Sequence, residues 1–579
     1  MHIAVSAGSI SAGSISAGSA GANAGAGDDA VTLTELDDAG RLLGQPETVA
    51  RDQLPHEVAR RERLSPRWVW DDTRRWYPEL LAHDVVVERC IDLRLCHTIL
   101  RASSATASSE LALAPVSPWD APATWAEQGQ PDTLFELGVQ RGRDDEAGLD
   151  PVEEFRLQRA AVAGAPDPNR LSLLLAAESA GSLIAIEMQH AGLPWNADRH
   201  NELLVDLLGE RPQPGQRPAR MHELLLEIRA AIDDPTANPD SPVELVKSLR
   251  RAGIDVSSTN RWELARHEHP VIEPLLAYKK LSRLLTANGW NWSDSWVEGG
   301  RFRPVYVPGG VVTGRWAADG GGALQLPHQV RGAVIADPGW MFVVADAAQL
   351  EPRILTAMSG DRAMAAAGRD RDLYDGIVAS GAVDTRAHAK VGMLGAMYGG
   401  TTGESGRMLP RLARAYPDAI RFVEEAARLG ESGAVVSTHL GRTSPRPSAQ
   451  WREAQDDAQQ EGASEAVQTR AKTARRSWGR FTRNFVVQGT AAEWALSWMA
   501  GLRRRLVLLG PGLPLRDRPH LVFFLHDEIV VHTPAALAET VAAEVRAAAE
   551  DAGRLLFGAV PVQFPVTVAV VDSYDKAKA

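Results

Sequence analysis

A short apolar run that ends on a carboxylate constrains this chain more than any other feature. Five apolar residues precede Asp346, and a helical pattern begins at Gln349. The run is too short for a helix core and fits a strand that is packed on both faces. An acid at the end of such a strand is a good metal ligand. The same residues also fit a capping box, in which Asp346 accepts from the first-turn N–H groups and Gln349 reaches back.

A second carboxylate lies far down the chain, between two apolar, β-rich runs. Leu521–Leu525 and Ile529–His532 flank the triplet His526-Asp527-Glu528, which predicts a hairpin. A plain turn would favour Gly or Asn, so this triplet indicates chemistry. Carboxylates on neighbouring strands can hold two divalent cations about 3.5–4 Å apart, which stabilise the attacking and leaving oxygens of a phosphoryl transfer.

Length and composition limit the class of protein. With 579 residues, 44% of them hydrophobic, the chain predicts two to four domains with ordinary cores. No apolar run approaches the roughly 18 residues of a membrane span and the start lacks a signal-peptide pattern, so we expect a cytoplasmic protein without membrane contact. Cys90 and Cys96 have no companion pair and are expected in the core. The net charge of −12 argues mildly against nucleic acid, but basic residues cluster between Arg470 and Arg483.

The N-terminal part predicts a small α/β domain. Residues 6–27 repeat Ser, Ala and Gly and read as a flexible linker. A strand at Arg67–Trp70, a helix at Thr73–Leu81 and a strand at Val85–Val87 follow. The sequence Pro166-Asp-Pro-Asn169 then marks a domain boundary.

The rest of the chain alternates helical and strand patterns. Helices are expected at 171–208 with an interruption at Gly192–Trp195, and at 221–232, 241–249, 274–285, 362–430, after Gly462 and at 489–508. Strands are expected at 302–312, 340–346, 521–525, 529–532 and 566–571. One sheet would therefore collect strands from both sides of a helical insertion.

Two polar stripes have a spacing of four residues, which keeps side chains on one winding face of a helix. Arg386, Lys390 and Tyr398 form the first, and such a stripe can hold a triphosphate or simply be the wet side of an amphipathic helix. Arg480, Asn484 and Gln488 form the second, whose hydrogen-bonding partners are either a nucleic-acid strand or neighbouring protein. Lys279, Lys280 and Arg283 are a solvated helix face or a grip on a phosphate backbone.

Four ordered segments resemble the catalytic motifs and the intervening helix of the family A DNA polymerases, the bacterial DNA polymerase I type. They are residues 346–361, 386–399, 480–492 and 526–528. Further likeness runs through Thr313-Gly-Arg315 with Gln325, and the whole covers roughly residues 171–579. The resemblance implies a template-directed DNA polymerase, a DNA-directed nucleotidyltransferase of replication or repair that acts as a monomer at the bacterial nucleoid. Its partners would be primer-template DNA and deoxynucleoside triphosphates.

The resemblance also implies a fold of the α/β multidomain class. A right-hand polymerase with an antiparallel palm sheet and helical fingers and thumb would follow an RNase H-like, exonuclease-type α/β domain. The expected ranges are 1–166 for a degenerate 3′–5′ exonuclease-like domain and 171–579 for the polymerase, with the thumb at about 175–300, the palm at about 300–355 and 490–579, and the fingers at about 356–489.

Site residues follow from the same resemblance. Asp346 and Asp527 would bind two Mg²⁺ ions, for which Mn²⁺ can substitute, with Glu528 beside them and Lys390 as a proton donor to pyrophosphate. The nucleotide would contact Arg386, Lys390, Tyr398, Gln349, Glu351, Leu394 and His526. Glu351 would exclude a 2′-hydroxyl and favour deoxynucleotides. DNA would contact Arg315, Gln325, Arg353, Arg480, Asn484, Gln488, Lys279 and Lys280.

Departures from the family pattern matter as well. Leu394 stands where the family usually has a ring, which changes how the sugar is packed, but no metal ligand is lost. The N-terminal domain lacks the Asp-x-Glu of a proofreading exonuclease, since Ser-Ala-Gly follows Val5. Asp71-Asp72 reads as a helix cap or as a remnant of that site. We expect no proofreading. The alternatives are a bifunctional enzyme with residual 3′–5′ exonuclease and a non-catalytic DNA-binding module.

Overall fold

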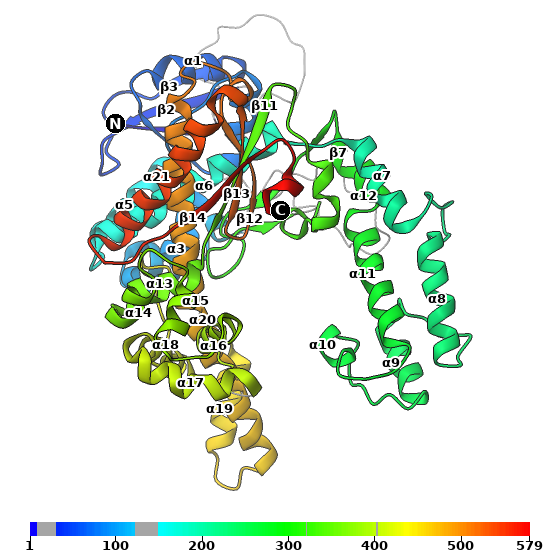
Figure 1. Cartoon of the computed structure of the whole chain (residues 1–579). Helices are drawn as coiled ribbons and strands as arrows, with labels where there is room; N and C mark the ends of the chain where they lie inside the picture. The colour runs from blue at the N-terminus through cyan, green and yellow to red at the C-terminus, as the bar shows by residue number, and fades with distance from the viewer. Residues whose placement is uncertain (8–29, 122–148, 320, 401–402, 579) are drawn as a thin grey trace, which may run out of the picture.

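The computed structural model describes residues 1–7, 30–121, 149–319, 321–400 and 403–578. Figure 1 shows an N-terminal α/β unit beside a central sheet, with a helical arm on one side of the sheet and a helical lobe below it. The arm and the lobe are well separated in that view. Most of the predicted linker at 6–27 lies outside the described residues.

The N-terminal unit is built on a five-stranded sheet of order β3-β2-β1-β4-β5. Strands β1, β2 and β3 are antiparallel neighbours, whereas β4 and β5 run parallel to β1. The strands are β1 (His2–Ala7), β2 (Ala30–Leu36), β3 (Glu47–Ala50), β4 (Arg67–Trp70) and β5 (Cys90–Asp92). The helices are α1 (Leu54–Glu62), α2 (Thr73–Ala82), α3 (Leu93–Ala102), α4 (Glu110–Leu113) and α5 (Pro151–Ala163). The predicted strand at Arg67–Trp70 and the predicted helix that begins at Thr73 are confirmed as β4 and α2.

The predicted strand at Val85–Val87 is wrong. A turn at His83 and Asp84 precedes these residues, which form no regular element, and the Val85 N–H donates to the Leu80 carbonyl at 2.9 Å. The Val87 carbonyl accepts from Arg503 Nη2 at 2.6 Å. The Val87 side chain is buried in the core, while the backbone of Val85 and Val87 bonds to partners outside the sheet.

Helix α6 (Pro168–Ala191) joins the N-terminal unit to the rest of the molecule. Its start follows the predicted Pro/Asp boundary, because Asp167 caps it by accepting from the Arg170 N–H at 3.1 Å. Among the described residues, α6 is the helix whose length and composition could span a membrane. However, 72% of its most apolar 18-residue window is buried inside the protein. It is therefore a core helix, packed against α2, β5 and α20.

The arm that follows α6 is helical throughout its length. It comprises α7 (Ala197–Leu208), α8 (Ala219–Ala231), α9 (Pro242–Arg251), α10 (Arg261–Leu264), α11 (Ile272–Asn288) and α12 (Trp290–Trp296). These helices confirm the ranges predicted up to residue 285. The predicted strand at 302–312 is largely absent, because only the short strands β6 (Leu193–Pro194), β7 (Val297–Glu298), β8 (Arg301–Phe302), β9 (Tyr306–Val307) and β10 (Ala317–Ala318) form here.

The central sheet confirms the plan in which strands from both sides of an insertion meet. Its antiparallel order is β12-β13-β11-β14. The strands are β11 (Trp340–Ala347), β12 (His520–Leu525), β13 (Glu528–Pro534) and β14 (Val566–Val571). The long helix α20 (Glu465–Leu508) and α21 (Ala538–Phe557) pack against the sheet. The nearly continuous buried pattern of β13 fits its inner place in the sheet, between β12 and β11.

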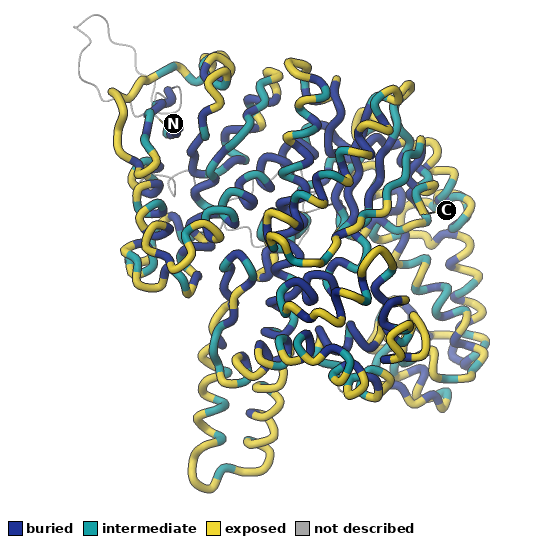
Figure 2. Tube along the Cα trace, turned by 60° about the vertical axis from the view of Figure 1, so that its left-hand side comes forward, coloured by how far each residue is buried: buried dark blue, intermediate teal, exposed yellow. Residues whose placement is uncertain are grey.

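The lobe is the insertion between β11 and the second half of α20. It contains α13 (Leu350–Ser359), α14 (Arg362–Ala367), α15 (Leu373–Ala379), α16 (Arg386–Tyr398), α17 (Gly403–Ala415), α18 (Pro417–Glu431) and α19 (Ala449–Gln459). The two helices predicted after Gly462 and at 489–508 are one continuous helix of 44 residues. Its first half forms with α19 an exposed hairpin that projects from the lobe (Figures 1 and 2).

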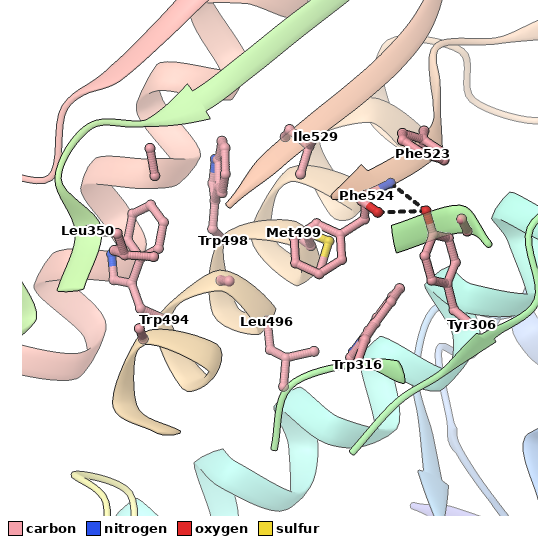
Figure 3. Close-up of a cluster of buried hydrophobic side chains, with 14 of the residues drawn as sticks. Tyr306, Trp316, Leu350, Trp494, Leu496, Trp498, Met499, Phe523, Phe524 and Ile529 are labelled. Carbon is pink, nitrogen blue, oxygen red and sulfur yellow. Dashed lines mark hydrogen bonds between the residues drawn. The ribbon is translucent and has the colours of Figure 1, made fainter. Parts of the chain in front are cut away.

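An aromatic cluster fixes the end of the sheet that faces the lobe. Trp494, Leu496, Trp498 and Met499 of α20 meet Phe523, Phe524, Ile529, Tyr306, Trp316 and Leu350 (Figure 3). Tyr306 is the polar member: its hydroxyl donates to the Phe524 carbonyl at 2.6 Å and accepts from the Phe524 N–H at 2.9 Å. These two hydrogen bonds fix the backbone of Phe524, which lies two residues before the His526–Asp527 turn.

Candidate active site

The sheet brings the two predicted metal ligands to one edge. Asp346 lies near the end of β11, opposite Glu528 of β13 and Thr567 of β14. The turn between β12 and β13 consists of His526, whose φ of 62° is left-handed, and Asp527. The Ala347 N–H donates to the Asp527 carbonyl at 3.0 Å, which ties this turn to the end of β11. Burial, and then the nearby charge of Asp346, raise the pKa of Asp527 to about 6.

The capping-box alternative for Asp346 is wrong. Helix α13 begins at Leu350, and its cap position is Gln349, which has a left-handed φ of 49° and makes no side-chain bond to the first turn. Gln349 instead accepts from the Leu373 N–H at 3.3 Å and donates to Asp372 Oδ2 at 2.9 Å. The carboxylate of Asp346 therefore stays free of the helix and is 35% exposed.

Glu528 is buried and has partners that the sequence did not reveal. Its Oε1 accepts from the Tyr574 hydroxyl and from Arg331 Nη1, the latter at 3.3 Å. Lys578 Nζ lies 2.6 Å from its Oε2 and 3.0 Å from Oδ2 of Asp346. No pattern in the sequence distinguishes these partners, because they come from separate segments that meet only in the fold.

A cavity of about 570 Å³ opens at this edge of the sheet. It lies between the sheet, the start of α13, α16 and α20. Nine residues selected from the sequence line it: Arg315, Asp346, Gln349, Glu351, Arg386, Lys390, Leu394, His526 and Asp527. Tyr374 also lines it and was missed. The structure thus brings both carboxylates and both cations of the α16 stripe into one space.

Helix α16 is amphipathic, and its polar stripe faces the cavity rather than open solvent alone. Its opposite side is buried through Ala389, Met393, Ala396 and Met397. Arg386 donates to Asp372 Oδ2 at 2.7 Å, and its guanidinium lies 5.4 Å from the ring centre of Tyr374. Within the described parts of the chain, Lys390 forms no ion pair, so its ammonium is available to a ligand.

Glu351 stands at the far end of the α16 stripe, held by two neighbours. The Tyr398 hydroxyl donates to its Oε2 at 2.6 Å, and Arg315 forms an ion pair with its Oε1. Burial, followed by this hydrogen bond, raises the pKa of Tyr398 to about 12. Leu394 also lines the cavity and contributes an apolar side chain to its wall.

The remaining predicted contacts lie around the cavity or away from it. Arg480 is exposed on α20 and donates to Ser477 Oγ at 2.8 Å, whereas Asn484 and Gln488 are half-buried further along the helix. Gln325 is exposed near β10. Lys279 and Lys280 lie on α11 of the arm, where Lys279 donates to Thr259 Oγ1 at 2.8 Å and Lys280 is exposed. None of these lines the cavity.

The predicted DNA contact of Arg353 is wrong. Its side chain is 2% exposed and donates to the carbonyls of Gly368, Arg371 and Gln563 at 2.9–3.1 Å. Both Nη atoms thus donate inside the protein and Nε is buried, so the guanidinium presents no exposed donor to a phosphate. Arg353 instead ties α13 to the segment before β14.

The acids of the N-terminal unit serve the helices beside them. Asp72 caps α2 by accepting from the Arg74 N–H at 2.9 Å, as one of the two interpretations expected. Asp71 accepts from Trp76 Nε1 at 2.5 Å. A third acid, Asp92, accepts from Thr73 and Leu95, and burial followed by the charge of Asp72 raises its pKa to about 7. In the described ranges, no group of three or more His, Cys, Asp or Glu side chains is arranged to hold a metal, here or at the central sheet.

Comparisons with known proteins agree with this geometry. A family model for DNA polymerase family A matches residues 219–576. DNA polymerase I of Chloroflexus aurantiacus is 26% identical over 320 residues, 50% of this chain and 31% of the relative. Thermostable DNA polymerase I of Thermus aquaticus is 25% identical over 352 residues, 56% of this chain and 38% of the relative. The chain thus matches about a third of the length of each of these relatives.

A solved structure shares the fold over nearly the whole chain. It is the polymerase domain of Pol1 from M. smegmatis in complex with DNA primer-template and a nucleotide, with a TM-score of 0.65 and 17% identity, over 95% of this chain and 93% of that one. At that identity the likeness concerns the fold alone. The family model covers well over half of the chain, so this protein belongs to DNA polymerase family A.

Proposed function

We propose that this protein is a template-directed DNA polymerase that adds deoxynucleotides to a primer 3′-hydroxyl. One observation carries the proposal: the cavity that holds Asp346 and Asp527 at a sheet edge also receives Arg386 and Lys390 from α16. Carboxylates on one side and cations on the other match a triphosphate whose α-phosphate is attacked while its β- and γ-phosphates are held.

The right-hand architecture gives each part of the fold a task. The central sheet corresponds to the palm, the lobe α13–α19 with the first half of α20 to the fingers, and the arm α7–α12 to the thumb. The N-terminal unit corresponds to the exonuclease-like domain. Its three antiparallel strands followed by two parallel ones support an RNase H-like sheet.

The residues at the sheet edge fit a divalent metal. Asp346 and Asp527 offer hard oxygen ligands close enough for one charge to raise the pKa of the other carboxyl. Two protein carboxylates are what Mg²⁺ usually takes when substrate phosphates supply further ligands. Bound there, Mg²⁺ or Mn²⁺ would stabilise charge on the attacking and leaving oxygens.

The other cavity residues would bind and select the nucleotide. Arg386 would leave Asp372 to grip the triphosphate through its forked donors, and Lys390 would add a point charge and give a proton to the departing pyrophosphate. Glu351, held by Tyr398 and Arg315, would fill the space of a 2′-hydroxyl. Gln349, Leu394 and His526 would contact the nucleotide at the rim. A rigid wall of this kind favours deoxynucleotides.

DNA would lie across the cavity mouth. Arg315, Gln325, Arg480, Asn484 and Gln488 would contact template, primer and the nascent pair, and Lys279 and Lys280 would reach the duplex from the arm. The half-buried stripe on α20 has a polar face that a strand can satisfy. Arg480 and Lys280 are exposed and offer positive charge to phosphates.

We also propose that the N-terminal unit does not proofread. The end of β1 carries Ser6 and Ala7 where an exonuclease needs carboxylates. Asp71, Asp72 and Asp92 spend their oxygens on the first turns of α2 and α3 and on Trp76. Asp92 next to Asp72 is the feature that keeps a residual 3′–5′ exonuclease as the second candidate activity.

The test is primer extension on a templated hairpin with Mg²⁺ and deoxynucleotides. Wild type should extend the primer, and Asp527→Ala should bind the hairpin with similar affinity but extend it at least about a thousandfold more slowly, a loss of roughly 4 kcal/mol of transition-state stabilisation. A lane without nucleotides should keep the primer at full length. Binding without extension by the wild type would leave a non-catalytic DNA-binding module, and a shortened primer would establish the exonuclease.

A further inference from the structure

One cation lies directly on the carboxylates at the sheet edge and has no part in the site derived so far. The ammonium of Lys578 bridges Oδ2 of Asp346, at 3.0 Å, and Oε2 of Glu528, at 2.6 Å. The Lys578 side chain is 45% exposed, whereas that of Glu528 is only 3% exposed. Lys578 therefore joins an accessible carboxylate to a buried one.

The segment that carries Lys578 is anchored to the core of the protein at its first residue, Tyr574. Lys578 ends the short helix η9 (Tyr574–Lys578). Tyr574 is 1% exposed; its N–H donates to the Val334 carbonyl at 3.0 Å and its hydroxyl donates to Glu528. Arg331 packs over the same ring at 4.3 Å. Tyr574 thus fixes the start of η9 beside Glu528, one helical turn from Lys578.

The other charges and donors around these carboxylates show what Lys578 contributes. Oε1 of Glu528 accepts from Tyr574 and Arg331. Its buried Oε2 has the ion pair with Lys578 and, among the described residues, no donor aligned for a hydrogen bond. Within the described ranges, Lys578 is the only ion-pair partner of Asp346. A metal ion on Asp346 would meet the positive charge of Lys578 at the same carboxylate, and two cations that close repel each other.

We propose that Lys578 is a built-in counter-cation of the catalytic carboxylates, which a divalent metal must displace from Asp346 when it binds. The ammonium would then stay with Glu528. Lys578 is a positioning residue, since it acts through Asp346 and Glu528 and touches neither substrate nor metal. The inference rests on the proposed function, because it assumes that Asp346 and Asp527 are the metal ligands.

Lys578 would therefore keep the affinity of the protein for the metal low until a nucleotide binds. Without nucleotide, the metal competes with Lys578 for Asp346 alone. Triphosphate oxygens add ligands and negative charge, which favour the metal over the ammonium. Removing the ammonium should therefore tighten metal binding most in the absence of nucleotide.

The experiment measures Mn²⁺ binding to the full chain without DNA or nucleotide, from the electron paramagnetic resonance signal of free Mn²⁺. Lys578→Met should bind Mn²⁺ about fivefold or more tightly than wild type, the lower end of usual coupling between sites. Lys578→Arg keeps the charge and should bind like wild type. Lys576→Met is the matched control, because Lys576 lies on the same helix and pairs with the exposed Asp572 at 2.7 Å.

A second readout separates this effect from a merely structural one. In metal-free buffer Lys578→Met should melt at a lower temperature than Lys576→Met. Saturating Mn²⁺ should raise its melting temperature by more, because the stabilisation that a ligand gives grows with the logarithm of its affinity. Asp527→Asn should weaken Mn²⁺ binding in both the wild-type and the Lys578→Met backgrounds.

Equal Mn²⁺ affinity of Lys578→Met and wild type, with Asp527→Asn still weakening it, would overturn the inference and leave the proposed metal site standing. If Asp527→Asn leaves Mn²⁺ affinity unchanged, the metal site itself is elsewhere and the inference fails with it. Tightening in Lys576→Met as large as in Lys578→Met would also overturn it, since the effect would then be one of net charge.

Discussion

Among single residues, Glu351 shows how neighbouring side chains hold a proposed selector of the sugar in place. Tyr398 and Arg315 each hold one of its carboxylate oxygens. The two contacts fix the position of the carboxylate at the cavity wall, which Leu394 also lines. A 2′-hydroxyl would therefore meet an oxygen that has no freedom to move aside.

Glu351→Ala should lower the preference for a deoxynucleotide over the matching ribonucleotide about tenfold to a hundredfold, the range over which a pocket discriminates one small group. The loss should come from faster ribonucleotide insertion, measured as kcat/KM for single insertions of each nucleotide. Glu425→Ala, on the exposed face of α18, is the control and should keep the wild-type ratio. An unchanged ratio in Glu351→Ala would assign selection to another side chain.

Arg353 shows where an expectation carried over from a family resemblance fails. The resemblance implied a DNA contact for Arg353, yet its side chain is turned inward, onto three carbonyls. Those carbonyls belong to segments distant in sequence, so no local pattern indicates them. By contrast, Asp346, Arg386, Lys390 and Asp527, which were selected from the sequence, do line one cavity.

Among the elements, strand β12 is the support on which the Asp527 turn depends. Tyr306 holds the backbone of Phe524 through two hydrogen bonds inside the aromatic cluster (Figure 3). The sequence predicted β12 from its apolar residues, but the partner from β9 lies more than two hundred residues away.

Tyr306→Phe should lower the free energy of unfolding by about 1–3 kcal/mol, because the buried N–H and carbonyl of Phe524 lose their partner. Urea unfolding followed by circular dichroism measures the change. Tyr416→Phe removes a hydroxyl that bonds to the side chain of the exposed Ser380 at 2.8 Å and should cost less. A loss as small as that control would mean that water replaces the Tyr306 hydroxyl.

Helix α20 carries a buried acid whose protonation should be visible in stability. Glu493 accepts from the Leu440 N–H at 3.0 Å and from Thr438, and burial raises its pKa from 4.5 to about 7. Between these values the folded state binds a proton that the unfolded chain releases. The free energy of unfolding therefore falls as the pH rises from about 4.5 to 7.

Glu493→Gln should remove this part of the pH dependence. The difference in unfolding free energy between pH 5 and pH 8 should shrink by up to roughly 3 kcal/mol relative to wild type, since one pKa unit corresponds to about 1.4 kcal/mol. Urea unfolding at both pH values gives the comparison. If the wild type and Glu493→Gln keep the same difference, Glu493 is ionised throughout.

At the scale of the whole molecule, a buried ionic network ties the N-terminal unit to the catalytic half. Arg503 of α20 donates to Glu187 of α6 at 2.6 Å and 2.8 Å and to the Val87 carbonyl at 2.6 Å. The Tyr77 hydroxyl of α2 also donates to Glu187. Burial opposes the charge on Glu187, but Arg503 and these hydrogen bonds keep its pKa below the ordinary value.

Arg503→Met should destabilise the protein by about 3–5 kcal/mol, because it leaves Glu187 charged and buried without its partner. Thermal and urea unfolding measure the loss. The double variant Glu187→Gln with Arg503→Met should recover part of it. Additive losses in the double variant would show that the two side chains are not coupled.

The sequence by itself determined the types of elements, the strand and hairpin that carry Asp346 and Asp527, and the order of the charged stripes. These features depend on local periodicity and on chemistry carried by single residues, both of which can be read along the chain. The continuous α20, the absence of a strand at Val85–Val87, the inward turn of Arg353 and the contact of Lys578 with Asp346 were decided by tertiary structure. Each depends on a partner from a distant segment, and burial against that partner outweighs what the local sequence favours.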